Sequence, residues 1–194
     1  MSEQKEVYIV GGPNGAGKTT FVKQFLPNYI NVRNFVNADD IAGGLSPLDS
    51  SSMNITSGKL MLQLIDKYKN KGEPFGFEST LAGKKWMRMI RELKGAGYLA
   101  YIFFLDLASA ELAVSRVKYR VESGGHDIPE ETIRRRYLRS RRNFWYNYRA
   151  EVDGWYLFDN STKVPKLVAN NISRELKVID LKYLKFFEDT LGEG

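Results

Sequence analysis

A phosphate-binding loop near the N-terminus constrains the fold of this chain more than any other feature. Residues 12–19 read Gly-Pro-Asn-Gly-Ala-Gly-Lys-Thr and directly follow the apolar run at residues 7–10. A strand that leads straight into a G-x-x-x-x-G-K-T loop places backbone N–H groups around the phosphates of a nucleotide. Glycines supply the positive φ angles and the close backbone approach that such a loop needs. The sequence therefore predicts a nucleoside triphosphate site on an α/β fold.

The residues of this loop have separate expected tasks. Lys18 should reach the β- and γ-phosphates, and the Thr19 hydroxyl should coordinate Mg²⁺. A helix that begins near Gly17 would direct the positive end of its dipole at the same phosphates. The predicted nucleotide contacts cover one continuous stretch: Gly12, Pro13, Asn14, Gly15, Ala16, Gly17, Lys18, Thr19 and Thr20.

Length and composition limit the other possibilities. The 194 residues suit one α/β domain with a small C-terminal appendage at about residues 163–194. No apolar stretch nears the roughly 18 residues of a membrane span, and the N-terminus lacks the features of a signal peptide, so we expect a cytoplasmic protein. The chain has no cysteine and one histidine, which excludes disulfides and leaves Mg²⁺ carried by ATP as the expected metal.

Apolar segments alternate with helical patterns along the chain. Strands are predicted at residues 7–11, 35–37, 75–78, 99–107 and 155–158, and helices at residues 58–70 and 84–94. Strands that alternate with helices form a parallel sheet with right-handed crossovers. The predicted fold is therefore a three-layer αβα P-loop NTPase sandwich with a five-stranded or slightly larger parallel sheet. Ligands bind beyond the carboxyl ends of such strands, where Asp106 and Asp159 also lie.

The net charge of +6 comes from one segment. Residues 134–149 hold seven arginines and no acidic residue, so the rest of the chain carries about −1. Arginines near a phosphate-binding loop can serve nucleotide phosphates as well as a nucleic-acid backbone. The helical spacing predicts a core face of Ile133, Tyr137, Phe144 and Tyr148 and a solvated stripe of Arg135, Arg139, Arg142 and Arg149.

An acidic pair after the second predicted strand points to a second substrate. Asp39 stands across from the phosphate-binding loop, where a carboxylate can orient an acceptor hydroxyl and take its proton. The alternative is that Asp39 and Asp40 only cap a helix that starts at Ile41.

Polar residues after the third predicted strand extend this acceptor side. Glu78 can order Mg²⁺-bound water or contact the acceptor, and Thr80 can add a hydrogen bond. The alternative for Glu78 is a simple ion pair with a nearby lysine. Asp106, at the end of the next strand, is a weaker candidate that can equally cap the following helix.

A hinged, arginine-rich helical lid is predicted at about residues 120–136. The i, i+4 spacing puts Arg116 and Arg120 on one helix face, and a Gly-Gly pair follows before the next helix starts. Arg116 can stack on the nucleotide base. Arg120 and either Arg134 or Arg136 can neutralise charge on the phosphoryl group during transfer.

Together these motifs resemble the zeta-toxin family of P-loop kinases, in particular its small stand-alone members. The resemblance rests on five ordered segments: Gly-Pro-Asn-Gly-Ala-Gly-Lys-Thr-Thr, Val-Asn-Ala-Asp, Phe-Glu-Ser-Thr-Leu, Gly-Gly-His-Asp-Ile-Pro-Glu-Glu-x-Ile-Arg-Arg-Arg-Tyr and Phe-Asp-Asn-Ser. Characterised members are ATP-dependent kinases of UDP-N-acetylglucosamine that an antitoxin holds in check. The resemblance implies these roles: Asp39 as catalytic base, Glu78 and Thr80 as acceptor contacts, Arg120 and Arg134 as lid phosphate ligands, and Asn160 near the adenine.

The leading hypothesis is an ATP- and Mg²⁺-dependent kinase that phosphorylates a hydroxyl of a small metabolite, such as a nucleotide sugar. One rival is a non-catalytic ATP-binding switch that recognises a protein partner such as an antitoxin. The other is a nucleic-acid-binding P-loop protein that uses the arginine stripe, which the sequence favours less because the charge is confined to one segment beside the predicted lid.

Overall fold

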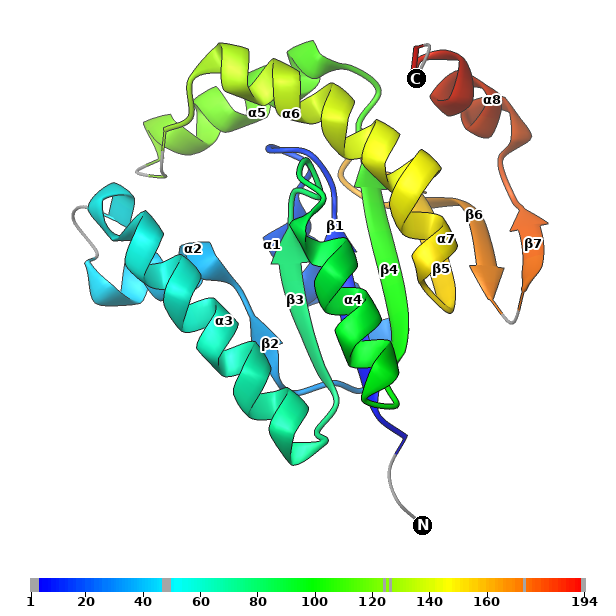
Figure 1. Cartoon of the computed structure of the whole chain (residues 1–194). Helices are drawn as coiled ribbons and strands as arrows, with labels where there is room; N and C mark the ends of the chain where they lie inside the picture. Colours follow the sequence, from blue (N-terminus) through cyan, green and yellow to red (C-terminus); the bar gives the residue numbers. More distant parts are fainter. Residues whose placement is uncertain (1–3, 47–49, 124, 126, 173, 193–194) are drawn as a thin grey trace.

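The computed structural model describes residues 4–46, 50–123, 125, 127–172 and 174–192 (Figure 1). The strand bounds are β1 (Glu6–Gly11), β2 (Phe35–Val36), β3 (Phe75–Ser79), β4 (Leu99–Asp106), β5 (Gly154–Asp159), β6 (Lys166–Ile172) and β7 (Glu175–Val178). In the described residues they form one seven-stranded sheet of order β2-β3-β1-β4-β5-β6-β7. Strands β1 to β5 run parallel, as predicted, and β6 and β7 are antiparallel additions at one edge.

The parallel strands need cover on both faces because they are apolar along most of their length. Strand β4 reads Leu-Ala-Tyr-Ile-Phe-Phe-Leu-Asp and is buried continuously from Ile102 to Asp106. The covering helices are α1 (Lys18–Gln24), α2 (Ala38–Leu45), α3 (Asn54–Lys71), α4 (Lys85–Gly95), α5 (Ala110–Glu122), α6 (Glu130–Asn143), α7 (Arg149–Glu151) and α8 (Leu181–Asp189). None of these helices, within the described part of the chain, is long and apolar enough to cross a lipid bilayer.

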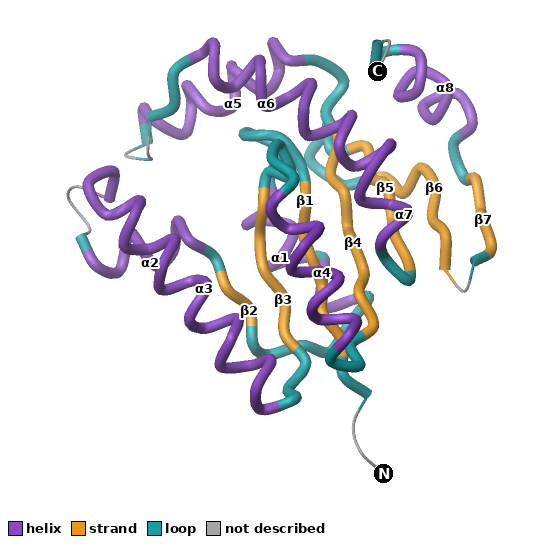
Figure 2. Tube along the Cα trace, in the orientation of Figure 1, coloured by secondary structure: helices purple, strands orange, loops and turns teal. Residues whose placement is uncertain are grey.

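Two separate cores lie on opposite faces of the sheet. Helices α3, α4 and α8 pack in one core, and α1 and α5 pack in the other, so the predicted three-layer αβα sandwich is confirmed (Figure 2). Helix α6 takes part in both cores, with Tyr137 in one and, directly after the helix, Phe144 in the other. The predicted core face of this segment is also confirmed, because its four members are 8% exposed or less.

Helix α6 crosses the carboxyl ends of the parallel strands on its way from one core to the other (Figure 1). The Tyr137 hydroxyl donates to the carbonyl of Leu107, just after β4, at 2.8 Å. Asn143 Nδ2 donates to the carbonyl of Leu81, just after β3, at 2.9 Å. These bonds fix the helix above the edge of the sheet at which ligands bind in parallel α/β folds.

The C-terminal appendage consists of the antiparallel pair β6 and β7 followed by α8, and it supplies one partner of Asp106. This carboxylate is fully buried and accepts from Arg141 Nε at 2.9 Å and from the Tyr183 hydroxyl at 3.1 Å. Arg141 also donates to Thr190 Oγ1 at 2.8 Å and so ties α6 to α8. The placement of Asp106 among the functional strand ends is therefore corrected: it is an internal anchor.

Of the four arginines predicted to form a solvated stripe, two are exposed and two are not. Arg142 donates to the carbonyl of Leu191 at 2.6 Å, and the Arg149 guanidinium stacks over the Trp145 ring at 3.6 Å from its centroid. Both therefore pack against neighbouring parts of the fold. Arg135 and Arg139 are exposed.

Candidate active site

The phosphate-binding loop has the backbone that its glycines predict. Gly12, Gly15 and Gly17 have φ angles of 146°, 78° and 77°. A Cβ atom on Gly12 would lie 2.4 Å from the carbonyl oxygen of Leu105, and one on Gly15 would lie 2.6 Å from that of Ala113. Side chains at these positions would collide with backbone that cannot move aside. The loop therefore needs glycine both for its conformation and for its close packing on β4 and α5.

Lys18 begins α1 and lies over the loop. Its Nζ donates to the carbonyls of Gly12 and Pro13, both at 3.1 Å. Burial lowers the pKa of Lys18, as do Arg120 and Arg136, while Glu78 and Asp39 act in the opposite direction. A polyanion that enters here would favour the charged lysine and supply it with stronger acceptors.

The side chain of Asn160 contacts the backbone of the phosphate-binding loop. Its Nδ2 donates to the carbonyl of Ala16 at 2.6 Å, and the side chain is buried. Arg116 lines the ligand cleft and donates to the carbonyls of Asn160 and Ser161 at 2.8 and 2.9 Å. The side chain of Asn160 therefore contacts the loop backbone, and its place near the adenine stays a prediction.

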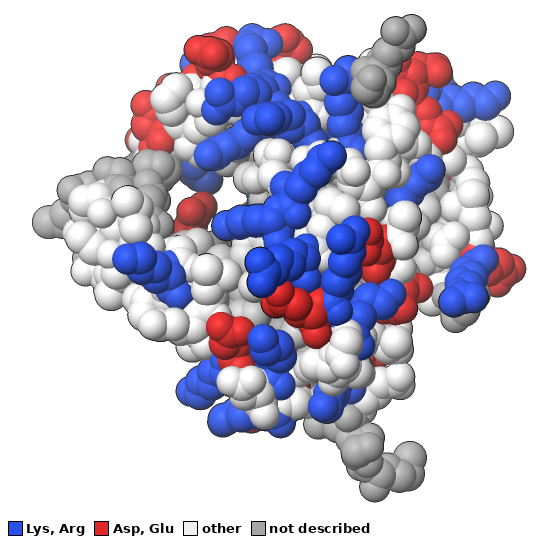
Figure 3. All heavy atoms as spheres, in the orientation of Figure 1, with Lys and Arg blue, Asp and Glu red and all other residues white. Residues whose placement is uncertain are grey.

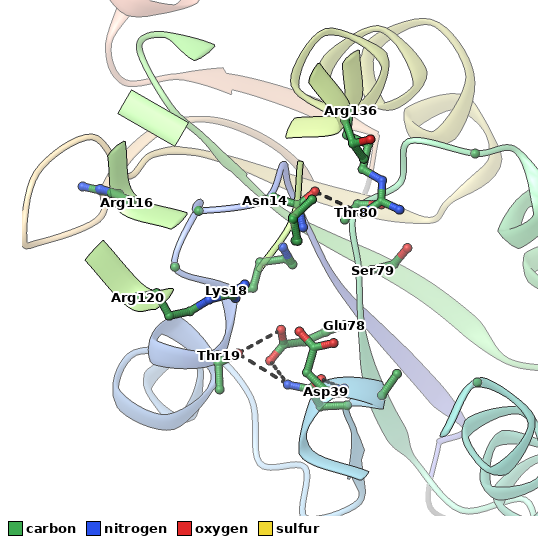
Figure 4. A pocket seen from close by; sticks show the side chains of 18 of the residues that line it. Asn14, Lys18, Thr19, Asp39, Glu78, Ser79, Thr80, Arg116, Arg120 and Arg136 are labelled. Carbon is green, nitrogen blue, oxygen red and sulfur yellow. Dashed lines mark hydrogen bonds between the residues drawn. The ribbon is translucent and has the colours of Figure 1, made fainter. Parts of the chain in front are cut away.

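Asn37 forms hydrogen bonds with both acidic residues predicted on the acceptor side, Asp39 and Glu78. Helix α2 begins at Ala38, and Asn37 is its N-cap, so neither Asp39 nor Asp40 caps a helix. Asp39 lines the cleft in the first turn of α2, and Asp40 is not among the lining residues described. Glu78 accepts from Asn37 Nδ2 at 3.1 Å and from the Thr19 hydroxyl at 3.3 Å (Figure 4). The alternative of an ion pair between Glu78 and a lysine is thus replaced by hydrogen bonds to Asn37 and Thr19.

One deep cleft joins these groups. It has a volume of about 840 Å³, near the upper end of the roughly 300–1,000 Å³ typical of ligand pockets. In Figure 3 the surface is hollowed between α2–α3 and the helices above, and Lys and Arg side chains gather over α6 and α4. The nucleotide end is lined by Asn14, Gly15, Gly17, Lys18, Thr19, Thr20 and Arg116, and the opposite end by Ala38, Asp39, Gly58, Met61, Ser79, Thr80, Gly83, Lys85 and Trp86. The predicted Thr80 lies in this second group, whereas Gly58, Met61 and Trp86 were not foreseen.

The lid contributes two arginines to the cleft, and the second is one of the two alternatives, Arg134 and Arg136, that the sequence left open. Arg120 of α5 and Arg136 of α6 line it, and Arg136 is 3.4 Å from Asn14 Oδ1 (Figure 4). Arg134 lies outside the cleft and pairs with Glu111 at 2.6 Å and Glu130 at 2.9 Å. Successive helical residues are turned by about 100°, so Arg134 and Arg136 face different directions. The geometry favours Arg136 for the phosphate role that was assigned to Arg134.

The connection between the two lid helices is described in part. Asp127, Ile128 and Pro129 line the cleft, and α6 starts at Glu130 as its proline predicts. Gly124 of the predicted Gly-Gly hinge lies outside the described residues, as does His126.

The donor set at the loop suits Mg²⁺. Thr19 Oγ1 and the Glu78 carboxylate, 3.3 Å apart, are the hard oxygen ligands that this ion prefers. No group of three or more His, Asp or Glu side chains suited to a metal occurs among the described residues. Any Mg²⁺ here would therefore depend on the phosphates of the nucleotide as well as on these two side chains.

Glu78 makes stability depend on pH. Burial raises the pKa of Glu78 from 4.5 to about 6, although Lys18 and the Thr19 hydrogen bond oppose the shift. The native state thus holds this proton more tightly than the unfolded chain. The contribution is complete below pH 4.5 and is lost as pH rises to 6, so the ionised carboxylate costs the native state about 2 kcal/mol at neutral pH.

Glu78→Gln should remove this dependence. In urea titrations without nucleotide or Mg²⁺, the free energy of unfolding of the variant should rise relative to wild type by about 2 kcal/mol between pH 4 and pH 7. A constant difference between the two proteins across this range would contradict the burial of Glu78 as its cause.

Comparisons with known proteins bear on the family and the fold of this chain. The family model described as "Zeta toxin" matches residues 1–164. The chain belongs to the zeta-toxin family. An uncharacterised protein of Haemophilus influenzae is 28% identical to this zeta-toxin family member over 134 residues, which are 69% of this chain and 94% of that protein.

Solved structures support the P-loop kinase fold. The complex of AvrRxo1-ORF1 and AvrRxo1-ORF2 with sulphate ions gives a TM-score of 0.75 at 17% identity, over 96% of this chain and 64% of that one. The PezAT chromosomal toxin–antitoxin system of Streptococcus pneumoniae gives 0.67 at 17% identity, over 100% of this chain and 89% of that one. This chain therefore spans about 64% of the length of the AvrRxo1-ORF1 chain, and the likeness is one of fold.

Proposed function

We propose that this zeta-toxin family protein is an ATP-dependent kinase that transfers the γ-phosphoryl group of ATP to a hydroxyl of a small metabolite. The observation that carries the proposal is the single cleft in which Lys18, Asp39 and Arg136 come together from three separate elements. A phosphate-binding lysine, a carboxylate across from it and lid arginines are the parts that phosphoryl transfer between two bound substrates requires.

The proposed reaction assigns one task to each side chain. The loop backbone and Lys18 hold the β- and γ-phosphates, and Mg²⁺, bound with Thr19, would neutralise their charge. Asp39 accepts the proton of the acceptor hydroxyl as its oxygen bonds to the γ-phosphorus. The bond to the bridging oxygen breaks and ADP leaves, while Arg120 and Arg136 balance the charge of the transferred group.

The acceptor end of the cleft suits a polar molecule with a flat or apolar part. Ser79, Thr80 and Lys85 offer hydrogen-bond donors, and Met61 and Trp86 offer apolar surface. A nucleotide sugar such as UDP-N-acetylglucosamine is the first acceptor to test, because members of this family phosphorylate it.

The test is the transfer of label from [γ-³²P]ATP. Wild type and Lys18→Ala would be incubated with Mg²⁺ and either UDP-N-acetylglucosamine or a small-metabolite extract, and products would be separated by chromatography. A labelled product that forms with wild type alone supports the kinase. ATP binding with no labelled product in any mixture would favour the ATP-binding switch instead.

The two lid arginines offer a matched comparison. Arg136→Ala should lower kcat for transfer by roughly 10- to 100-fold, the effect of one lost hydrogen bond to a charged group, because Arg136 lines the cleft beside the phosphate-binding loop. Arg134→Ala, two residues earlier on the same helix, removes the same side chain outside the cleft and should retain near wild-type kcat. A larger loss in Arg134→Ala would reverse this assignment.

We also propose a protein partner of antitoxin type. Of the solved structures with this fold, AvrRxo1-ORF1 is in complex with a second protein, AvrRxo1-ORF2, and PezAT is a chromosomal toxin–antitoxin system. Co-purification of the protein with the product of a neighbouring gene, and loss of kinase activity in that complex, would support the proposal; activity unaffected by every such product would count against it.

A further inference from the structure

Asn37 caps α2 and also lies beside Glu78, which a helix cap does not require. Val36 of β2 pairs with Phe77 of β3 in the parallel register, so Asn37 and Glu78 are the next residues on two adjacent strands. Asn37 directly follows β2 and Glu78 is the penultimate residue of β3, so both lie at the carboxyl end of the sheet, beside the phosphate-binding loop. Asn37 is only 8% exposed there and lines the cleft.

Both ends of the Asn37 amide are used. Its Oδ1 accepts from the backbone N–H of Asp39 at 2.8 Å and caps α2. Its Nδ2 donates to Glu78 Oε1 at 3.1 Å and lies 3.4 Å from Thr19 Oγ1. Because the Thr19 hydroxyl also donates to Glu78 Oε2, at 3.3 Å, the three side chains close a small ring of hydrogen bonds (Figure 4).

The capping role alone does not account for an asparagine. Serine, threonine and aspartate cap helices about as well, because a cap needs only an acceptor oxygen. Of the four preferred residues, asparagine alone adds an N–H₂ donor to that oxygen. The donor is what reaches the Glu78 carboxylate here.

We propose that Asn37 is a positioning residue that sets Glu78 and Thr19 in a fixed geometry relative to Asp39. The inference rests on the proposed kinase function and deepens it. One amide joins the end of β2, the start of the helix that carries Asp39, the end of β3 and the start of α1. Without the N–H₂ group, the side chains of Glu78 and Thr19 could rotate away from the reacting groups, and the distance between donor and acceptor sites would vary.

Asn37→Ser tests the donor separately from the cap. Serine keeps an acceptor for the Asp39 N–H and loses the N–H₂ group. We expect the thermal midpoint to change little and kcat to fall about tenfold or more, as for one lost hydrogen bond to a charged group. Asn37→Asp should also lower kcat, and because it places a second carboxylate beside that of Glu78 it should lower the thermal midpoint as well. Asn37→Ala should lower both, since it removes the cap too. Asn31→Ser, at an exposed position away from the cleft, is the matched control and should match wild type.

A double-mutant cycle with Glu78→Ala decides whether Asn37 acts through Glu78. In the Glu78→Ala background, Asn37→Ser should lower kcat by about twofold at most, because its partner is already gone. An equal loss in both backgrounds would overturn the inference. So would wild-type kcat in Asn37→Ser and Asn37→Asp with a loss in Asn37→Ala alone, since that pattern belongs to a helix cap.

A measurement that needs no turnover separates this inference from the proposed function. If wild type transfers no more label than Lys18→Ala, the kinase proposal fails. The contact is then tested by the side-chain N–H₂ resonances of Asn37 in ¹⁵N–¹H spectra, assigned by their loss in Asn37→Ser. These resonances should move on Glu78→Ala, and unchanged positions would overturn the role of Asn37.

Discussion

Asp39→Asn is expected to lower kcat for phosphoryl transfer by roughly 10³-fold, within the range for loss of a general base. The amide keeps the size of the carboxylate and cannot accept the proton of the acceptor hydroxyl. ATP binding should persist, because the phosphate-binding loop and Lys18 lie on the opposite side of the cleft. Initial rates with [γ-³²P]ATP and calorimetric titration of ATP measure the two quantities separately.

Asp40→Asn is the matched control for this prediction. Asp40 stands beside Asp39 in the first turn of α2 and is not among the lining residues of the cleft. The two substitutions remove the same negative charge from the same helix terminus, so their effects on helix stability should be alike. Equal rates in the two variants would show that Asp39 is not the base.

Asp106→Asn should cost about 3–5 kcal/mol of unfolding free energy, the largest loss of stability expected for a substitution outside the cleft. The variant leaves the Arg141 guanidinium, which is 1% exposed, without its anionic partner. Arg141 also bonds to Thr190 in the appendage, so its displacement should loosen α8. Urea unfolding gives the free energy, and hydrogen exchange of residues 181–189 reports on the helix.

An exposed carboxylate–arginine pair provides the comparison. Glu130 pairs with Arg134 at 2.9 Å, and both side chains are more than two-fifths exposed. Glu130→Gln should change the free energy of unfolding far less, because water screens and replaces an exposed pair. If the two substitutions cost the same, burial is not what makes the Asp106–Arg141 pair important.

The nucleotide side of the site could be predicted from the sequence because its determinants are local. Glycines that need positive φ, a lysine at the start of a helix and an apolar strand before them all lie within residues 7–19, and the structure reproduces each of them. The five parallel strands were predictable for a similar reason, since each is a nearly continuous apolar run.

The choice between Arg134 and Arg136, which the residues alone left open, depended on how a helix is turned. Arg134 and Arg136 are equivalent in composition and close in sequence. The burial of Ile133 and Tyr137 helps to fix the rotation of α6, and this rotation sends Arg136 into the cleft. The core face was already predicted from spacing, so a helical projection from these two residues could have indicated the choice.

The positioning role of Asn37 and the anchoring role of Asp106 depended on contacts across long stretches of chain. Asn37 and Glu78 are 41 positions apart, and Asp106 and Arg141 are 35 apart. The sequence does not distinguish a carboxylate at a strand end that faces a ligand from one that pairs with a buried arginine. The packing of α6 and α8 around Asp106 decides between these cases.

The amino-acid order thus specified the nucleotide-binding loop, the parallel sheet and the family, because each is encoded by neighbouring residues and short periodic patterns. Folding decided which acidic and basic side chains share the cleft. That outcome follows from strand register, from the rotation of α6 and from the docking of α8, which depend on packing between distant segments. Asn37 is an example of both contributions. The Val-Asn-Ala-Asp segment that contains it was visible in the sequence, whereas its hydrogen bonds to Thr19 and Glu78 exist only in the folded chain.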